Sequence, residues 1–369
     1  MVKYINSNKE IFCGDQYFLE HVAPLDFQYK IHKKELSPYF ESKGFKVSMM
    51  YDDFYSRFSG IHSDKYIPMD LYYFYILPAL NRYDFKNAYT DKNIFKLLFH
   101  DINQPETIAK NMNGIYYISD SIIVSEEEFF QFASSIKEEC IIKPTVCTCN
   151  GIGVARLITN NSIEQEQQIR SYKNNFIIQK KVKQHSEMKK LNESSLNTLR
   201  VFTYRTLDGK IEYMTGKTFG RYGGKGTIKD NGSAGGGIFG IDDSGIVADD
   251  VAFFKKMQKK FLSELGMNNL KVPNFDLVKK MVVSLHQRLP HFDFVGWDIA
   301  IDENGEPMLI EFNLEPSVEG PQMISGPLFD SYIEEILCRI SNVKKGTCEY
   351  IVSEFRTGFN FKLKISGSL

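Results

Sequence analysis

The stretch GWDIAIDENGEPMLIEFNLEP, Gly296–Pro316, consists of two apolar-rich runs on either side of the dipeptide Asn304-Gly305. An Asn-Gly pair between two such runs is a strong signal of a β-hairpin. A two-residue turn at Asn304-Gly305 and a four-residue loop from Glu303 to Glu306 predict the same register, in which Asp298 lies directly opposite Glu311. Like charges at opposed positions of neighbouring strands destabilise a sheet. The sequence therefore predicts that a further group offsets the repulsion between the two carboxylates.

Alternation along the hairpin predicts which side chains share a face. One face carries Ala300 and Leu309 together with Asp298, Glu311 and Asn313. The other face is expected to enter the core and carries Trp297, Ile299, Ile301, Ile310 and Phe312. Mg²⁺ is commonly held by one or two carboxylates together with substrate phosphates, so the first face is a candidate half-shell for this ion. A solvated sheet face explains the same alternation, and the hairpin alone favours neither interpretation.

The composition limits the classes of function. The chain has 369 residues, of which 43% are hydrophobic and 25% are charged, as in ordinary globular proteins. Lys plus Arg number 45 against 46 Asp plus Glu, which excludes a strong overall field for nucleic acid. The six cysteines have no metal-ligand spacing, and the most apolar run, Leu71–Leu80, is too short to span a bilayer. No secretory signal precedes it, so we expect a cytoplasmic protein with reduced thiols and no integral membrane segment.

Short strand-like runs alternate with helical segments, which predicts an α+β or α/β protein. Helices are expected over 126–139, over most of 251–289 and over 328–341, and the glycine-rich stretch 219–245 is expected to lie outside the core. The predicted organisation is an N-terminal domain, a first subdomain, a second subdomain with the hairpin and a C-terminal tail, over residues 1–90, 91–180, 181–341 and 342–369.

Three further segments carry candidate ligand-binding residues. Lys143 ends an apolar strand and is followed by a loop whose glycine amides are suited to phosphate oxygens, although a Walker A spacing is absent. Arg200 interrupts the strand-like run TLRVFTYR, and its planar guanidinium group is suited to bind a carboxylate or a phosphate. Arg221 and Asn231 lie among the glycines of 219–245. Each of these residues, taken singly, has a structural explanation that is at least as good. Lys143 is explained as a charged gatekeeper at a strand end, Arg200 as a member of a structural ion pair, and the glycine-rich stretch as a surface loop.

The chain order of these segments resembles the ATP-grasp enzymes. The order in that superfamily is matched by a helix start at Asp91-Lys92, then Lys143 with its glycine loop, then the run FIIQKKV and finally the hairpin. The stretches SSLNTLRVFT, 219–245 and GWDIAIDENGEPMLIEFN are most similar to its sugar-transfer-associated group, over roughly Tyr66 to Pro327. The resemblance implies an α+β (α/β) ATP-grasp fold, in which two α/β subdomains clamp ATP behind a smaller N-terminal domain. The glycine loop CTCNGIGV departs from the usual family pattern.

The resemblance also implies residue roles. Lys92 and Lys143 would neutralise the α- and β-phosphates of ATP, and Arg200 would face the transferred phosphoryl group, so Arg200 and Lys143 are the expected catalytic residues. Asp298, Glu311 and Asn313 would hold Mg²⁺. The remaining cofactor-binding candidates are Gln179, Lys180, Lys181 and Val182 at the adenine edge, His185 or Glu187 at the ribose, and Asn197, Arg221 and Asn231 on the phosphate or acceptor side.

The implied activity is ATP-dependent ligation of a carboxylate to an amine through an acyl phosphate. The family context points to cell-surface polysaccharide biosynthesis, with an amino acid or amine and a sugar acid or nucleotide-sugar as small-molecule partners and no nucleic acid. Two alternatives stay open: a kinase that phosphorylates a hydroxyl with the same grip, and a nucleotide-binding protein without turnover.

Overall fold

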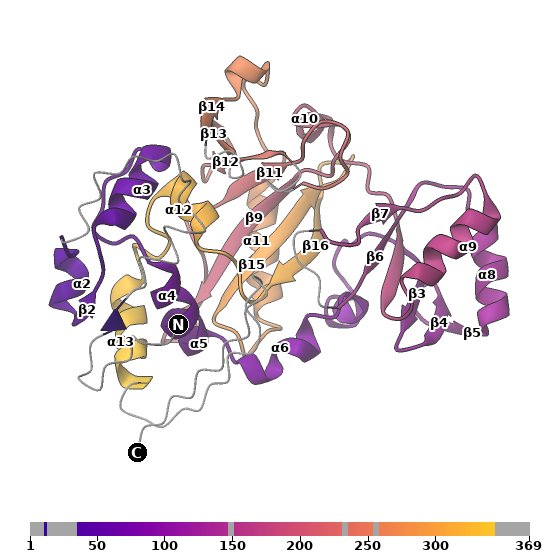
Figure 1. Cartoon of the computed structure of the whole chain (residues 1–369), viewed down its shortest axis with the longest axis horizontal. Helices are drawn as coiled ribbons and strands as arrows, with labels where there is room; N and C mark the ends of the chain where they lie inside the picture. Colours follow the sequence, from indigo (N-terminus) through magenta and orange to yellow (C-terminus); the bar gives the residue numbers. More distant parts are fainter. Residues whose placement is uncertain (1–10, 13–34, 147–150, 231–234, 254–257, 344–369) are drawn as a thin grey trace.

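The computed structural model describes residues 11–12, 35–146, 151–230, 235–253 and 258–343. Asn231, the start of the glycine loop (147–150) and nearly all of the predicted C-terminal tail lie outside the described residues. The described elements form a large central sheet, a smaller sheet to one side and a group of helices on the other side (Figure 1). Antiparallel sheets combined with helices confirm the predicted α+β class.

The large sheet is antiparallel and has the strand order β14-β13-β12-β11-β9-β15-β16, with β10 also paired to β9. Its central strands are the longest and most buried, because both faces of the sheet are covered. The strands are β9 (Thr198–Arg205), β10 (Ile211–Tyr213), β11 (Phe219–Tyr222), β12 (Gly237–Ile241), β13 (Val247–Phe253), β14 (Gln258–Phe261), β15 (Phe294–Ile301) and β16 (Pro307–Asn313).

Separate cores cover the two faces of the large sheet. On one face, side chains such as Val201 and Trp297 pack against α11 (Phe275–His286), η2 (Lys92–Ile94) and α7 (Phe95–Leu98). On the other face, Phe202 and Phe294 pack against an aromatic-rich group of helices (Figure 1). These helices, with the short π-helix η1, are α3 (Met50–Ser59), α4 (Met69–Leu71), η1 (Tyr72–Ile76), α5 (Leu77–Leu80), α12 (Glu319–Ser325) and α13 (Ile333–Val343).

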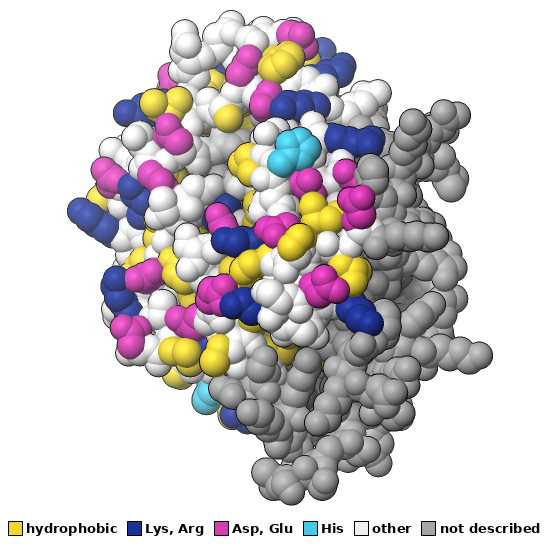
Figure 2. All heavy atoms as spheres, turned by 90° about the vertical axis from the view of Figure 1, so that its left-hand side faces the viewer, with side chains coloured by type: hydrophobic (Ala, Val, Ile, Leu, Met, Phe, Trp, Pro, Cys, Tyr) yellow, Lys and Arg dark blue, Asp and Glu magenta, His cyan; other side chains and the backbone are white. Residues whose placement is uncertain are grey.

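The surface formed by these helices carries acidic and basic side chains in close alternation (Figure 2). The smaller elements nearby are β1 (Ile11–Phe12), α2 (Pro38–Ser42), β2 (Phe45–Lys46) and α6 (Tyr83–Tyr89). Within the described residues, no helix is both long enough and apolar enough to cross a membrane.

The small sheet has the order β5-β4-β3-β8-β6-β7 and buries a core of its own against two helices. The first helix begins at a capping box, in which Ser125 and Glu128 satisfy each other's backbone N–H groups. The elements are β3 (Thr107–Met112), β4 (Ile115–Ile118), β5 (Ile122–Val124), α8 (Glu126–Ser135), β6 (Cys140–Pro144), β7 (Ala155–Arg156), α9 (Ser162–Ser171) and β8 (Phe176–Lys180). The short helix α10 (Ser186–Lys189) leads on to the large sheet.

Several expected elements are different in the structure. Within the described part of the expected helical region 251–289, only 275–286 is an α-helix, because 247–253 and 258–261 pair as β13 and β14 at the edge of the sheet and 263–265 (η5) is a single 3₁₀ turn. Pairing with a sheet edge overrides the weak helical preference of this segment. The expected helix 126–139 ends at Ser135, and the expected helix 328–341 is displaced to 333–343.

The glycine-rich stretch was expected to lie outside the core, and this prediction is wrong for its ends. Strand β12 is buried throughout, and Gly220 of β11 lies against the ring of Phe239, where a Cβ would come within 2.2 Å of ring atoms. The glycines here permit close packing between strands as well as loop freedom.

The hairpin β15–β16 has a three-residue loop, 303–305, in place of the predicted two- or four-residue loop. Gly305 N–H donates to the carbonyl of Asp302 (2.9 Å), and Asp302 N–H donates to the carbonyl of Glu306 (3.0 Å). Ile299 therefore pairs with Leu309, one residue away from the predicted register. A bulge at Ile310 restores the register, so that Asp298 opposes Glu311 as predicted. The bulge also reverses two predicted faces, since Leu309 joins the core and Ile310 lines the cleft described below.

Candidate active site

Three neighbouring strands place a row of charged side chains across the large sheet. Asp298 on β15 is paired with Arg200 on β9 and with Glu311 on β16. Further along the same face, the strands carry Phe202 and Phe294 of the aromatic core. The charged row thus lies at one end of this face of the sheet, and the aromatic core covers the other end. The central strands β9 and β15 hold the charged end rigidly.

Asp298 is buried and interacts with two guanidinium groups. Arg200 Nε donates to Oδ1 (2.5 Å) and its Nη2 donates to Oδ2 (3.1 Å), while Arg221 Nη2 lies 2.9 Å from Oδ2. Gly296 leaves room for this pair, because a Cβ there would lie 3.3 Å from Cδ of Arg200 and 2.8 Å from Pro316. Burial raises the pKa of Asp298, but the two arginines outweigh it and lower the pKa to about 2.

Glu311 has a different counter-charge, Lys92, whose Nζ lies 3.1 Å from Oε2. Asp91 caps the turn that carries Lys92 by accepting from Asn93 N–H, and Lys92 N–H donates to the carbonyl of Thr145 (3.1 Å). This backbone bond holds Lys92 beside the end of β6, which carries Lys143. Burial and the charge of Lys92 lower the pKa of Lys143 to about 8, against an opposing effect of Glu311.

The repulsion expected between Asp298 and Glu311 is therefore offset by protein cations, separately for each carboxylate. Asn313 lies on the same face, and its Nδ2 is 3.5 Å from Oδ2 of Asp298. Two carboxylates and one amide thus lie close together on neighbouring strands β15 and β16.

Arg221 connects this row to the glycine-rich segment. Its Nη2 donates to Thr198 Oγ1 (2.7 Å) and to Oδ2 of Asp230 (3.1 Å), in addition to its contact with Asp298. Thr198 Oγ1 donates to the same oxygen of Asp230. One guanidinium is thus shared between a carboxylate of β15 and a carboxylate of the segment that follows β11.

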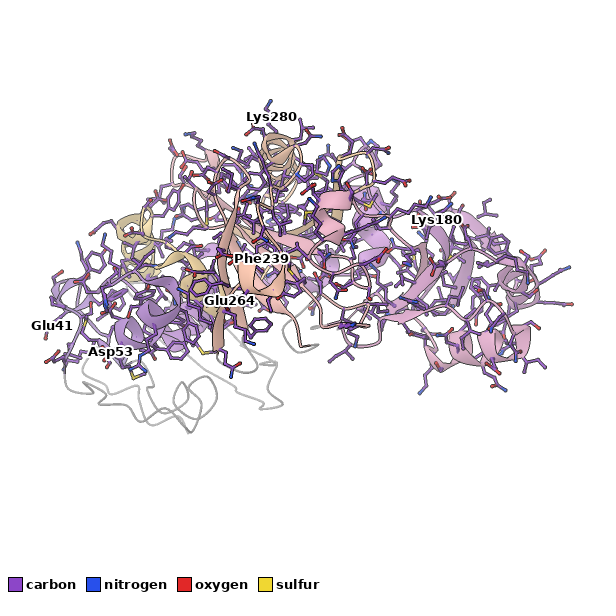
Figure 3. All side chains as sticks on the ribbon, turned by 90° about the horizontal axis from the view of Figure 1, so that it is seen from above. Glu41, Asp53, Lys180, Phe239, Glu264 and Lys280 are labelled. Carbon is purple, nitrogen blue, oxygen red and sulfur yellow. The ribbon has the colours of Figure 1, made fainter. Side chains whose placement is uncertain are left out.

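These residues line a cleft of about 640 Å³ between the two sheets. The small sheet contributes Lys143 and Lys180, near the ends of β6 and β8. Figure 3 labels Lys180 in the small sheet and Phe239 in β12 of the large sheet. Of the residues predicted from the sequence, those that line the cleft are Lys92, Lys143, Gln179, Lys180, Lys181, Val182, Arg200, Arg221, Asp298, Glu311 and Asn313. Apolar side chains of Ile141, Val154, Val182 and Ile310 line it as well.

Three of the predicted residues lie away from the cleft wall. His185 caps α10 by accepting from Glu187 N–H (3.1 Å), and Glu187 pairs with Lys190 (2.7 Å). Asn197 is fully buried, and its amide donates to Gln184 and to backbone carbonyls between β8 and β9. Its position explains how this connecting segment is held in place. Asn231 falls outside the described residues.

Thr198, Asp230 and Ile310 are among the residues of the cleft that sequence reasoning missed. Asp230 stands in the run KDNG, which resembles a turn, and the only signal was its proximity to Arg221 in a stretch already singled out. Ile310 was assigned to the core because simple alternation does not reveal a bulge.

The donor set fits a hard divalent cation that also binds phosphate. Among the described residues no three acidic, histidine or cysteine side chains converge, so the protein alone offers two carboxylates and an amide. Mg²⁺ is bound in this way when substrate phosphates supply further ligands. Arg200 and Arg221 pair with Asp298, and Lys92 pairs with Glu311.

Comparison with known proteins agrees with this arrangement. The profile of the sugar-transfer associated ATP-grasp family matches residues 75–336. Comparison with curated proteins finds no match.

Similar solved structures include the ATP-grasp ligase PsnB complexed with minimal precursor, Mg and ADP (14% identity, TM-score 0.40, 70% of this chain and 62% of that chain). Others are the biotin carboxylase domain of the Hydrogenobacter thermophilus 2-oxoglutarate carboxylase (13%, 0.43, 74% and 49%) and the D-alanine-D-alanine ligase from Coxiella burnetii (8%, 0.40, 69% and 59%). This chain spans less than two thirds of the length of each of these structures.

Proposed function

The chain belongs to the sugar-transfer associated ATP-grasp family, and from this premise we propose that it is an ATP-dependent ligase that joins a carboxylate to an amine. ATP and Mg²⁺ are the usual partners of ATP-grasp enzymes. The observation that carries the proposal is the cleft between the sheets. Its lining combines the carboxylates Asp298 and Glu311 with the cations Lys92 and Lys143. Such an array suits a polyphosphate with its metal ion.

We assign the nucleotide to the part of the cleft shared by the two sheets. Ile141 and Val182 on one side and Ile310 on the other offer apolar contact for a flat base, and the backbone of 179–182 offers hydrogen bonds at its edge. Lys92 and Lys143 neutralise phosphate oxygens. Asp298, Glu311 and Asn313 hold Mg²⁺, which when bound neutralises charge on the phosphates that react.

The chemistry follows from the weak electrophilicity of a carboxylate at neutral pH. Transfer of the γ-phosphoryl group to a substrate carboxylate gives an acyl phosphate with a good leaving group, and an amine then displaces phosphate. This chain's part is to position the reactants and to stabilise developing negative charge. Arg200 is paired with Asp298 at the charged end of the cleft, where its guanidinium would face the phosphoryl oxygens. The two sheets, by enclosing the site, exclude water that hydrolyses the intermediate.

The proposed substrates are a sugar acid and an amino acid or related amine, in the cytoplasmic stage of cell-surface polysaccharide synthesis. The family's association with sugar transfer supports this context. The basic side chains of the cleft, among them Lys189, Arg221 and Lys229, also favour an acidic acceptor.

The test is a screen for ADP release, with sugar acids and amino acids supplied singly and in pairs in the presence of Mg²⁺. The proposal predicts ADP release that needs a carboxylate, accumulation of a hydroxamate when hydroxylamine replaces the amine, and an amide with the true pair. A phosphate monoester formed from a hydroxyl compound, with no hydroxamate from any acid, would show that the enzyme is a kinase instead.

A further inference from the structure

Asp230 is a carboxylate of the cleft for which the nucleotide and the metal give no role. It lies in the segment between β11 and β12, beside Thr198 and Arg221, and its side chain is 22% exposed. Its contacts with Thr198 and Arg221 both reach Oδ2. Among the described residues nothing binds Oδ1, so this oxygen keeps its full capacity to accept a proton or a hydrogen bond.

Asp230 and Asp298 share Arg221 but differ in their total counter-charge. Asp298 has a second, bidentate partner in Arg200, whereas Arg221 is the single cation in contact with Asp230 in the described structure. The two environments separate the proton affinities of the pair. Burial, with the nearby charges of Asp298 and Glu311, raises the pKa of Asp230 against the effect of Arg221, while the pKa of Asp298 is lowered to about 2. Carboxylates separated in this way commonly divide into a permanently ionised group and a proton-transfer group.

The other acidic residues of the cleft are less suited to proton transfer. Glu138 and Glu139 form ion pairs with Lys180 (2.8 Å) and Lys181 (2.9 Å) at the end of β8. Glu193 is exposed, and no histidine is among the described residues that line the cleft. Asp298 and Glu311 are the proposed metal ligands.

We propose that Asp230 is the general base of the second half-reaction, in which an amine attacks the acyl phosphate. This inference rests on the proposed ligase function. An amino acid arrives as an ammonium ion, whose nitrogen has no free electron pair. Asp230 accepts one proton from it, the nitrogen forms a bond to the acyl carbon, and the bond from that carbon to the phosphate oxygen breaks. Inorganic phosphate leaves with that electron pair, and a further proton departs from the nitrogen of the new amide to solvent.

Arg221 and Thr198 act as positioning residues in this scheme, because both hold Oδ2 of Asp230 and leave Oδ1 directed to the acceptor. The location agrees with this role. Arg221 contacts both Asp230 and Asp298, and Asp298 in turn is bound by Arg200, the residue proposed to face the transferred phosphoryl group.

The test compares two nucleophiles with the panel of sugar acids and amino acids described above. Hydroxylamine is largely uncharged at neutral pH and needs no base, whereas an amino acid does. We expect Asp230→Asn to reduce amide formation by about 10²–10⁴-fold, the usual contribution of a general base. Any effect on hydroxamate formation should be much smaller than the effect on amide formation, and Asp230→Glu is expected to restore part of the amide synthesis.

Asp208→Asn is the matched control, because Asp208 also accepts from a threonine hydroxyl, that of Thr206, but in an exposed turn outside the cleft. It should leave both products at the wild-type level, and thermal unfolding should show that each variant is folded. An Asp230→Asn protein that loses both products equally, or retains both, would overturn the inference. A wild-type protein that forms neither product from any pair would instead overturn the proposed ligase function.

Discussion

The large and small sheets line the same cleft in different ways. The large sheet presents side chains in buried, cross-strand ion pairs, such as Arg200 with Asp298. The small sheet presents Lys180 and Lys181, whose ion pairs are exposed, and only Lys143 reaches the charged centre. Buried pairs are costly to disrupt, whereas exposed pairs contribute little. We therefore propose that the chemistry depends on the large sheet, and that the small sheet contributes mainly backbone groups and the charge of Lys143 to nucleotide binding.

The largest expected effect comes from Asp298→Asn on the large sheet. Removing this charge leaves two arginines without their shared partner, which should cost about 3–5 kcal/mol of stability. It also removes a proposed ligand of Mg²⁺, so we expect ATP turnover to fall on the order of 10³-fold. Denaturant unfolding and an ADP-release assay measure the two effects.

Asp293→Asn is a matched control for Asp298→Asn. Asp293 also lies between two arginines, 2.7 Å from Arg339 and 3.3 Å from Arg205, but outside the cleft. It should lose stability in the same way without a comparable loss of turnover per folded molecule. Equal losses of turnover in both variants would mean that Asp298 acts only through stability.

A second expected effect concerns acid sensitivity of the large sheet alone. His286 of α11 is fully buried near Trp297, its Nε2 donates to the carbonyl of Phe292 (2.8 Å), and burial lowers its pKa to about 4. The unfolded chain binds a proton near pH 6.5, so stability is complete above that pH and falls as the pH decreases toward 4. The difference amounts to about 3 kcal/mol.

The single tryptophan makes this prediction measurable, because Trp297 lies in the large sheet and the stretch 107–180 of the small sheet contains no histidine. Urea unfolding followed by tryptophan fluorescence at pH 7 and pH 4.5 should show the loss, and His286→Leu should reduce the slope of stability against pH. Hydrogen exchange of the amides of β3 and β8 provides the comparison. If both sheets lose the same stability, the histidine is not its source.

The sequence was informative where a local pattern determines the geometry. The opposition of Asp298 and Glu311 follows from hairpin pairing, and the cap at Asp91 follows from helix-start chemistry. The α+β class follows from the mixture of periodicities. The resemblance to ATP-grasp enzymes, confirmed by the family match, then connected segments that are far apart in the chain.

The sequence was not informative where pairing with a strand far away in the chain determines the local conformation. The bulge at Ile310 depends on a three-residue turn with Gly305 at positive φ, and Asn-Gly alone predicts the two-residue turn. Strand β14, QKKF, has no strand-like alternation and is extended because it pairs with β13. Asp230 belongs to the site only because β11 brings Arg221 next to Thr198 of β9. Contacts of this kind require the fold.

The smallest expected effects test the small sheet, by comparing Lys143→Met with Lys180→Met. Lys143 is beside Lys92 and Glu311, where its charge has a phosphate partner in the proposal, so its loss should weaken binding of Mg²⁺–ATP about 10–100-fold, or roughly 1.5–3 kcal/mol. Lys180 is exposed and pairs with Glu138, and the proposed contact with the base uses backbone. Its substitution should therefore change the affinity by less than about 1 kcal/mol.

The pH dependence of binding separates the two lysines further. The pKa of Lys143 is lowered to about 8, so above that pH the free enzyme must take up a proton to bind phosphate with a charged lysine. Wild-type affinity, measured by calorimetric titration, should therefore weaken as the pH rises above 8, and Lys180→Met should weaken in the same way. Lys143→Met should lack this decline because its titrating group is gone. A decline that persists in Lys143→Met would assign the titration to another group and remove Lys143 from the phosphate site.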